Sequence, residues 1–136
     1  MTSPHTILNP DVLAPPRGFS HVVIPKEGRL VFLAGQAAQL PDGSISGSDM
    51  AEQFDVAAVN VVAALAAADA HPEHLVSLQI FVTSVDSYRA SLGVIGEAYR
   101  RHIGDHYPAV SLFEVSGLFD PEALVELVAT AVVPAD

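Results

Sequence analysis

The sequence predicts an α+β domain in which two helices pack on one face of a mixed sheet. Two long segments carry apolar residues at helical spacing, and the segment between them alternates strictly between apolar and polar residues. Short apolar runs bounded by glycine and proline lie towards both ends of the chain. The resulting order is strand, strand, helix, strand, helix, strand, strand. A length of 136 residues is typical of one domain, so we expect residues 1–136 to form a single unit.

The N-terminal part of the chain is predicted to be an extended arm followed by a hairpin. Residues 1–18 hold four of the ten prolines. Because proline restricts φ and lacks a backbone donor, a helix is disfavoured there. The apolar runs 19–24 and 30–34 are separated by a short polar link that contains Gly28. This arrangement predicts two strands joined as a hairpin.

The first helix is predicted to begin at Asp49. Its carboxylate can accept from the first turn, and Glu52 three residues later completes a capping box. Apolar residues then recur every three or four positions, at Phe54, Ala58, Val61, Leu65 and Ala68. His71-Pro72 is predicted to end this helix.

The second helix is predicted to be capped by Asp86 or Ser87 and to end at Gly104 in a left-handed conformation. Its apolar stripe is Tyr88, Leu92, Ile95, Tyr99 and Ile103.

Two glycines and one charge pair inside this second helix carry further expectations. Gly93 and Gly96 each cost about 1 kcal/mol relative to alanine. We therefore expect a close backbone neighbour there. Glu97 and Arg101 are four residues apart, which predicts an exposed ion pair.

Three strands complete the sheet. In segment 76–83, Val76, Leu78, Ile80 and Val82 share one face, which predicts a strand with that face in the core. Segments 109–116 and 124–133 are predicted to be the last two strands.

The composition excludes several classes of function. Six Lys and Arg against sixteen Asp and Glu give a net charge of −10, which repels phosphate backbones and anionic lipid. We therefore expect neither nucleic acid nor a membrane as a partner. The absence of cysteine excludes disulfides and Cys-based metal sites. No signal peptide and no apolar run of about 20 residues is visible, so a cytoplasmic protein is expected.

Five short segments, in order, resemble the RidA/YjgF family over roughly residue 8 to the C-terminus. They are Gly18-Phe19-Ser20, Leu33-Ala34-Gly35-Gln36, Val59-Asn60, Tyr107-Pro108-Ala109 and Leu124-Val125-Glu126-Leu127. The resemblance implies a chorismate-mutase-like fold, a homotrimer, and small-molecule sites in the clefts between subunits. It also implies cofactor-free hydrolysis of imines and enamines to keto acids and ammonia.

The resemblance assigns roles to individual residues. Glu126, in the last strand, matches the family glutamate that places the water, and is our catalytic candidate. The substrate-binding candidates are Phe19, His21, Gly35, Gln36, Leu92, Val110 and Leu112. Of these, His21 is included because it should share a face with Phe19, and Leu112 because it shares one with Val110. His21 could act as a proton shuttle there or serve only structure.

The chain departs from the family pattern at the residues that grip the substrate. Val110 stands where the family has an arginine for the substrate carboxylate. Losing such a pair forfeits about 1.5–3 kcal/mol of binding. Phe19 replaces a tyrosine, and Leu92 stands at a position that is often asparagine. We therefore expect a neutral or apolar ligand, unless another cation compensates. The candidates for that cation are Arg17, Arg29 and Arg89.

Two functions remain open from the sequence. One is the imine or enamine deaminase, and the other is a catalytically silent trimeric binding module. For Glu126 itself, a water-positioning base and a residue facing a solvated channel are both compatible with the pattern. Glu114 is interpreted as a solvated strand end. The endoribonuclease activity sometimes attributed to the family is disfavoured by the net charge of −10.

Two histidine pairs have the spacing of metal ligands on a helix. A proline or a glycine interrupts each pair, so the helical geometry that would align the rings is broken. We therefore expect surface histidines and no bound metal. The pairs are His71 with His74 and His102 with His106.

Overall fold

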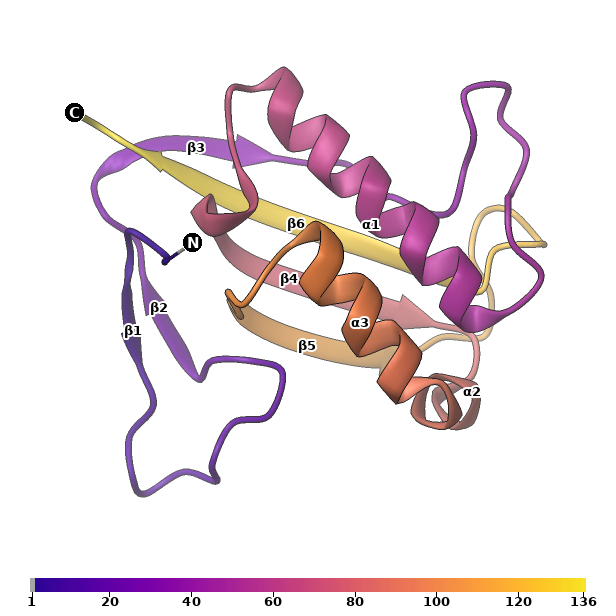
Figure 1. The fold of residues 1–136 in the computed structure, drawn as a ribbon, viewed down its shortest axis with the longest axis horizontal. Coiled ribbons are helices and arrows are strands. Elements are labelled where there is room, and N and C mark those ends of the chain that lie inside the picture. Colours follow the sequence, from indigo (N-terminus) through magenta and orange to yellow (C-terminus); the bar gives the residue numbers. More distant parts are fainter. Residues whose placement is uncertain (1) are drawn as a thin grey trace.

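A computed structural model describes residues 2–136. Within them, four strands form a sheet in the order β3-β6-β4-β5, and helices α1 and α3 lie against one of its faces (Figure 1). Strands β4 and β5 run parallel and the other pairs antiparallel, so the predicted α+β fold with a mixed sheet is confirmed. The bounds are β3 Gly28–Phe32, α1 Met50–Ala67, β4 Leu75–Val82, α3 Leu92–His102, β5 Ala109–Glu114 and β6 Val125–Pro134.

The predicted N-terminal hairpin is wrong. Strand β2 (Val22–Ile24) pairs with β1 (Thr6–Leu8), which comes from the arm, and β3 pairs with β6. The arm is therefore partly a strand, and β1 and β2 form a separate two-stranded ribbon beside the main sheet (Figure 1). Local sequence predicted where the strands lie, but pairing depends on partners far away in the chain, which a local pattern does not report.

The core lies between the sheet and α1. Along β6, the odd positions 125 to 131 are buried, and in β4 the side chains of Leu78, Ile80 and Val82 are buried opposite them. The strand register is irregular between Leu75 and Ser77, so that Leu75 rather than Val76 joins the core. Alternation predicted this face of β4 correctly apart from that irregularity.

Helix α1 begins as predicted. Asp49 caps it by accepting from the backbone N–H of Glu52 at 2.9 Å. It ends at Ala67, earlier than the predicted stop, because Asp69 turns into the left-handed region at φ 54°. Pro72 instead begins the short 3₁₀ turn η1 (Pro72–His74). The length and hydropathy of α1 would suit a membrane span, but the buried side of α1 packs on the sheet, as expected of a core helix.

The predicted second helix is broken into two. Ser84, rather than Asp86 or Ser87, caps α2 (Val85–Ala90) by accepting from the Ser87 N–H, and the break falls at Ser91 before α3. Gly104 does follow α3 with φ +98°, which confirms the left-handed stop.

The expectations for the glycines and the charge pair of this helix are not met. A Cβ added to Gly93 would meet nothing within 4 Å in the described residues, and one added to Gly96 would meet only the side chain of Arg100. No close backbone neighbour therefore explains either glycine within the described part of the protomer. Arg101 forms its ion pair with Asp55 of α1 rather than with Glu97, so it joins two helices instead of bracing one.

Candidate functional site

Four of the predicted substrate-binding residues line one cavity. Phe19, Leu92, Val110 and Leu112 surround a space of about 270 Å³. A neighbouring space of about 290 Å³ reaches deeper between α3 and the sheet. We call the two together the α3 cavity, because they share the residues Arg17, Gly18, Ile80, Tyr88, Leu92 and Val110.

Strand register and an arm contact position these residues. Val110 and Leu112 pair with Leu78 and Ile80, so their side chains face the helices. The arm is tied to the segment that precedes β5. The Ser20 hydroxyl donates to the Tyr107 carbonyl at 2.6 Å, and the Ser20 N–H donates to the carbonyl of the following proline at 2.9 Å. This anchor holds Phe19 at the edge of the cavity.

Tyrosines form much of the cavity wall. Tyr99 stacks on Tyr107 with ring centroids 5.0 Å apart, and its hydroxyl donates to the His106 carbonyl at 2.6 Å. Tyr88 meets Phe54 edge-to-face. Burial raises the pKa of Tyr88 to about 12 and raises the pKa of Tyr99 still further, so both hydroxyls stay protonated at neutral pH.

Glu126 lies on the opposite face of the sheet, next to Gly35, and the backbone of Gln36 ties this segment to β6. The Gln36 N–H donates to the Leu127 carbonyl at 2.8 Å, and the Leu127 N–H returns a bond at 2.9 Å. This bridge places Gly35 under the side chain of Glu126, which is half-buried. A Cβ on Gly35 would be 2.6 Å from Oε2 of Glu126. The Glu126 carboxylate can therefore keep this position only if residue 35 is glycine.

The alternation of the strands therefore divides the predicted site in two. Glu126 pairs with Phe81 and points to the face without helices, whereas Val110 points to the helix-covered face. Within the described protomer, the sheet separates the catalytic candidate from the α3 cavity.

His21 lies beside the cavity without being among the residues that line its described part. Its ring meets Phe19 edge-to-face, at a centroid distance of 5.0 Å. Nε2 donates to the Ala14 carbonyl at 2.7 Å, and the backbone N–H donates to Asn9 Oδ1 at 2.8 Å. These bonds hold the loop of the arm, so its observed contacts are structural.

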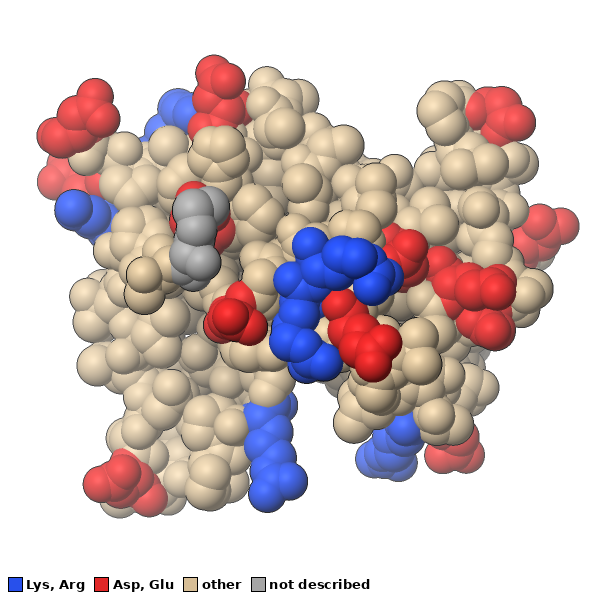
Figure 2. All heavy atoms as spheres, in the orientation of Figure 1, with Lys and Arg blue, Asp and Glu red and all other residues tan. Residues whose placement is uncertain are grey.

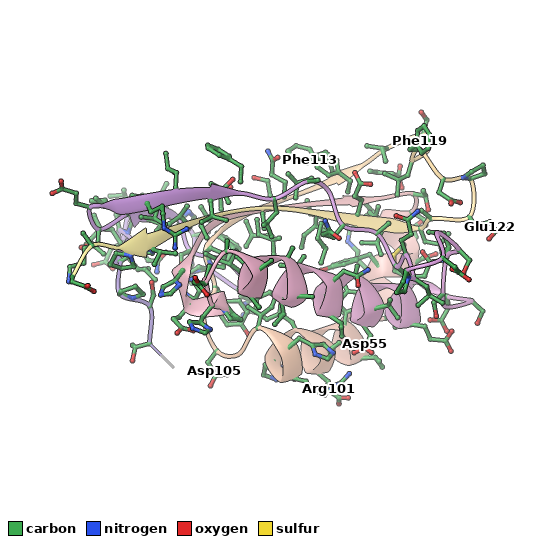
Figure 3. The ribbon with its side chains drawn as sticks, turned by 90° about the horizontal axis from the view of Figure 1, so that it is seen from above. Asp55, Arg101, Asp105, Phe113, Phe119 and Glu122 are labelled. Atoms are coloured by element: carbon green, nitrogen blue, oxygen red, sulfur yellow. The ribbon has the colours of Figure 1, made fainter. Side chains whose placement is uncertain are left out.

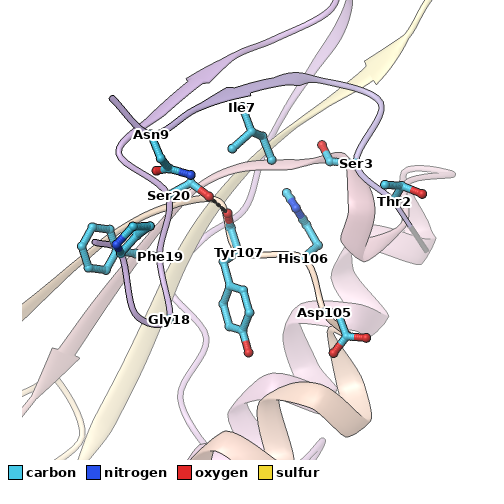
Figure 4. Close-up of a pocket in the computed structure, with 11 residues that line it drawn as sticks. Thr2, Ser3, Ile7, Asn9, Gly18, Phe19, Ser20, Asp105, His106 and Tyr107 are labelled. Carbon is cyan, nitrogen blue, oxygen red and sulfur yellow. Dashed lines mark hydrogen bonds between the residues drawn. The ribbon is translucent and has the colours of Figure 1, made fainter. Parts of the chain in front are cut away.

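A further hollow of about 520 Å³ separates the arm from the segment before β5 (Figure 4). Asp105, His106 and Tyr107 line one side, and the arm, with Asn9, lines the other. His106 is buried there, against the expectation of a surface histidine, because its Nε2 donates to the Leu75 carbonyl at 2.8 Å. Burial lowers the pKa of His106.

Other charged and polar candidates have structural partners. Glu114 is exposed, and its Oε1 accepts from the Val85 N–H at the start of α2 at 2.9 Å. His102 Nε2 lies 2.8 Å from Asp55 Oδ1. In residues 2–136 no cluster of three or more His, Asp or Glu side chains could hold a metal ion. Of the suggested replacement cations, Arg29 donates to the Ala68 carbonyl, whereas Arg17 lines the α3 cavity.

Sequence reasoning missed Tyr88, Tyr99 and Arg100 as cavity residues. The two tyrosines belong to a helical stripe, and a stripe that faces a cavity has the same spacing as one that faces a packed core. Arg100 lies in a basic cluster on the same helix, and position in the sequence alone does not tell which cation turns towards the cavity.

Comparison with known proteins decides the family. A family model described as Endoribonuclease L-PSP matches residues 10–133. The chain belongs to this family. It is similar to a solved Yersinia pestis structure, YyfB, described as a protein of unknown function of the conserved Rid family. The two share 32% identity and a TM-score of 0.83, over 95% of this chain and 98% of that one.

Further relatives support the same family assignment. A putative endoribonuclease from Thermotoga maritima shares 27% identity and a TM-score of 0.69, over 93% of both chains. Rv2704 from Mycobacterium tuberculosis, of the YjgF/YER057c/UK114 family, shares 29% identity and a TM-score of 0.64, over 95% of this chain and 99% of that one. The Schizosaccharomyces pombe protein mmf2, mitochondrial, is 33% identical over 84 residues, which span 62% of this chain and 63% of that protein. The RidA/YjgF resemblance is confirmed, and membership supports a role in processing small molecules.

Proposed function

We propose that the protein is a cofactor-free hydrolase of imines or enamines, acting in clefts between the protomers of a homotrimer. The observation that carries the proposal is the division of the site by the sheet. Glu126 lies over Gly35 on one face, and four of the substrate-binding candidates, Phe19, Leu92, Val110 and Leu112, line the α3 cavity on the other. A neighbouring protomer can bring an acid of this kind to the mouth of the cavity, which a single protomer does not do.

The face that carries Glu126 supports an assembly. Phe32 is 75% exposed, Leu30 60% and Phe113 45%. Figure 3 shows Phe113 on the side of the sheet away from Asp55 and Arg101, which mark the helices. Large exposed apolar side chains on one face of a sheet are typical of interaction sites in soluble proteins. A second copy of the same face is the occupant that membership of an oligomeric family favours.

The chemistry needs one carboxylate and one water. In the proposed reaction the Glu126 carboxylate accepts a proton from water as the water oxygen bonds to the C=N carbon. The carboxyl group returns this proton to the nitrogen, which gives a carbinolamine. Glu126 then takes the proton of the new hydroxyl and passes it to the nitrogen as the C–N bond breaks and the C=O bond forms, so that ammonia leaves a carbonyl product. General acid–base catalysis of this kind contributes roughly 10²–10⁴-fold to the rate.

Charge argues against an RNA substrate. Figure 2 shows acidic side chains spread over the visible face, while basic ones are few and gather mainly over α3. A net charge of −10 makes the electrostatic part of RNA binding unfavourable. Salt-dependent binding of single-stranded RNA at physiological ionic strength would contradict the proposal.

The direct test compares Glu126→Gln with the wild type. Ammonia release would be measured on a panel of imines generated in the assay by an amino-acid oxidase. We expect the variant to lose about 100-fold or more of the rate, with unchanged oligomer mass and melting temperature. Glu27→Gln is the matched control, because Glu27 is an exposed carboxylate in the turn before β3. Full activity in Glu126→Gln would remove Glu126 as the base, and a wild type that releases no ammonia across the panel would leave only the binding module.

A further inference from the structure

Residues 2–26, which include the ribbon of β1 and β2, are held to the rest of the protomer at two points. We call them the ribbon segment. Its buried residues are His5 and Ser20, and none of its apolar side chains is buried. Within residues 2–136, three hydrogen bonds join the segment to the rest of the chain. Two come from Ser20, and the third comes from the ring of His5, which donates to the His74 carbonyl at 3.1 Å.

The contact at His5 uses both nitrogens of the ring. Nδ1 lies 3.0 Å from the backbone N of Lys26, and Nε2 makes the bond to His74. Because a backbone N–H can only donate and a carbonyl can only accept, Nδ1 carries no proton and Nε2 carries one. A protonated ring has N–H at both nitrogens and cannot accept from Lys26. The contact therefore suits only the neutral imidazole.

Two further imidazoles contact the same turn, η1. The half-buried ring of His74 accepts from the His71 N–H through Nδ1 at 3.0 Å, which closes the turn. The buried ring of His106 comes from the segment before β5 and donates to the carbonyl of Leu75, the residue that follows η1. His106 also lines the hollow of about 520 Å³ beside the ribbon segment (Figure 4). Three histidines from distant segments thus meet at one short turn.

The charges around these rings favour their neutral forms. Burial lowers the pKa of both His74 and His106, and a charge on His5 lowers each of them further. Glu73 of η1 acts in the opposite direction on both. Protonation at low pH therefore places like charges around one turn. The other charged or titratable groups near the three rings are His71, Lys26, Arg29 and Asp105.

We propose that His5, His74 and His106 form a pH-sensitive latch, which holds the ribbon segment on η1 while the rings are neutral and releases it when they are protonated. The two bonds of Ser20 do not titrate, so the segment stays attached there. The same segment carries Phe19 to the wall of the α3 cavity, so its release changes that wall. The proposal concerns regulation of the site described above, and it rests on the proposed function only for the effect on catalysis.

Amide hydrogen exchange, followed by NMR and expressed as protection factors, tests the latch at about pH 7.5 and pH 5. The pKa values of His74 and His106 lie below the ordinary 6.5, so the latch is closed above about pH 6.5 and opens as the pH falls through the lowered values. A two-stranded ribbon is marginally stable by itself. We therefore expect the amides of β1, β2 and Lys26 to lose protection at least about tenfold, the equivalent of one pKa unit.

The amides of β4 and β6 are the internal control for this measurement. They should keep their protection at the lower pH, because local opening leaves the core intact. Equal protection of the ribbon segment at both pH values would overturn the proposal. A loss that β4 and β6 share would also overturn it, because the whole protomer would then be unfolding.

His5→Gln removes the titration of the ring but keeps an acceptor for Lys26 and a donor for the His74 carbonyl. We expect this variant to be protected at pH 7.5 and to lose most of the pH response. His102→Gln is the matched control, because His102 pairs with Asp55 at the end of α3, and it should respond like the wild type. A full response in His5→Gln would overturn the proposal.

A titration of the ring settles the case in which the glutamine does not take the place of the histidine. If the ribbon segment of His5→Gln is unprotected at both pH values, the His5 ring of the wild type is titrated by NMR. Its midpoint should coincide with the loss of protection. A ring that stays neutral while the ribbon segment opens would overturn the proposal.

Glu126→Gln distinguishes the latch from the proposed function. Glu126 lies on the other face of the sheet, so this variant should show the exchange response of the wild type even though hydrolysis is lost. If the wild type releases no ammonia but the ribbon segment opens at low pH, the hydrolase fails and the latch survives. If ammonia is released but protection is the same at both pH values, the latch fails and the hydrolase survives.

Discussion

The two faces of the main sheet carry similar apolar side chains but differ in what covers them. On one face, Leu78 and Leu127 are fully buried beneath α1. On the other, Phe81 and Phe113 stack with ring centroids 5.5 Å apart, yet Phe113 remains 45% exposed. The covered face is complete within one protomer, whereas the open face leaves apolar surface in water.

This difference explains how the candidate site is divided. Because neighbouring residues of a strand point to opposite faces, Glu126 and Leu127 serve different surfaces although they are adjacent. The covered face provides stability and the α3 cavity, while the open face carries the acid. Stability and assembly can therefore be tested independently, by substitutions on one face or the other.

The largest effect is expected on the covered face. Leu78→Ala removes a fully buried side chain and leaves a cavity, so the free energy of unfolding should fall by about 2–5 kcal/mol. Urea denaturation followed by circular dichroism would measure it. Ile80→Val, a smaller truncation in the same strand, should cost about 0.5–1.5 kcal/mol. Equal costs for the two would show that this face is not the packed core.

On the open face, a charge should break the assembly without unfolding the protomer. Phe32→Asp places a carboxylate at a side chain that is 75% exposed, and burying it at an interface is costly. We expect sedimentation equilibrium to report the mass of one protomer, with ammonia release lost. Val59→Asp, on an exposed part of α1 away from this face, is the control. An unchanged mass in Phe32→Asp would show that the open face is not the interface between protomers.

A subtler change tests the position of the acid. Gly35→Ala introduces a methyl group where Oε2 of Glu126 now lies at 2.6 Å. The flexible side chain must move, so we expect ammonia release to fall at least tenfold, about 1.4 kcal/mol, with little change in melting temperature. Gly117→Ala is the control, because a Cβ there meets nothing within 4 Å in the described residues. Full activity in Gly35→Ala would mean that the position of the carboxylate is unimportant.

The smallest expected effect is on the pH dependence of stability. Burial holds the pKa of His106 below its ordinary value of 6.5, so the unfolded chain binds the proton more readily. Stability is then full above about pH 6.5 and falls as the pH drops through the lowered pKa. His106→Gln should make this fall shallower between pH 7 and 5, as measured by urea denaturation.

The control for this experiment is Ser116→Ala, because Ser116 is exposed and does not titrate. It should leave the slope of stability against pH unchanged. If His106→Gln also leaves the slope unchanged, the buried imidazole is not the titrating group.

Local patterns in the sequence predicted most elements but not their connections. The Asp49 cap, the alternation of β4 and the left-handed Gly104 follow from neighbouring residues, and the structure confirms each. The N-terminal hairpin and the unbroken second helix were wrong. The first depended on which strand lies next to β3, and the second overlooked the break at Ser91 between α2 and α3.

The candidate site was located by family motifs, but its arrangement was not. The motifs predicted Gly35, Glu126 and Val110 as site residues, and nothing in them indicated that the acid and the cavity lie on opposite faces. Nor did they indicate that Arg17 of the arm and Arg100 of α3 line one hollow with Tyr88. These residues come from distant segments, so only the packed chain brings them together.

By itself, then, the sequence determined the class of fold and the family and supplied Glu126 as the candidate acid, because these depend on periodicity and on short motifs within a segment. The tertiary structure alone decided which face each side chain serves, which cations have no acidic partner in the described chain, and which surface is left open. Those properties arise from contacts between residues far apart in the chain, and packing rather than local propensity sets them.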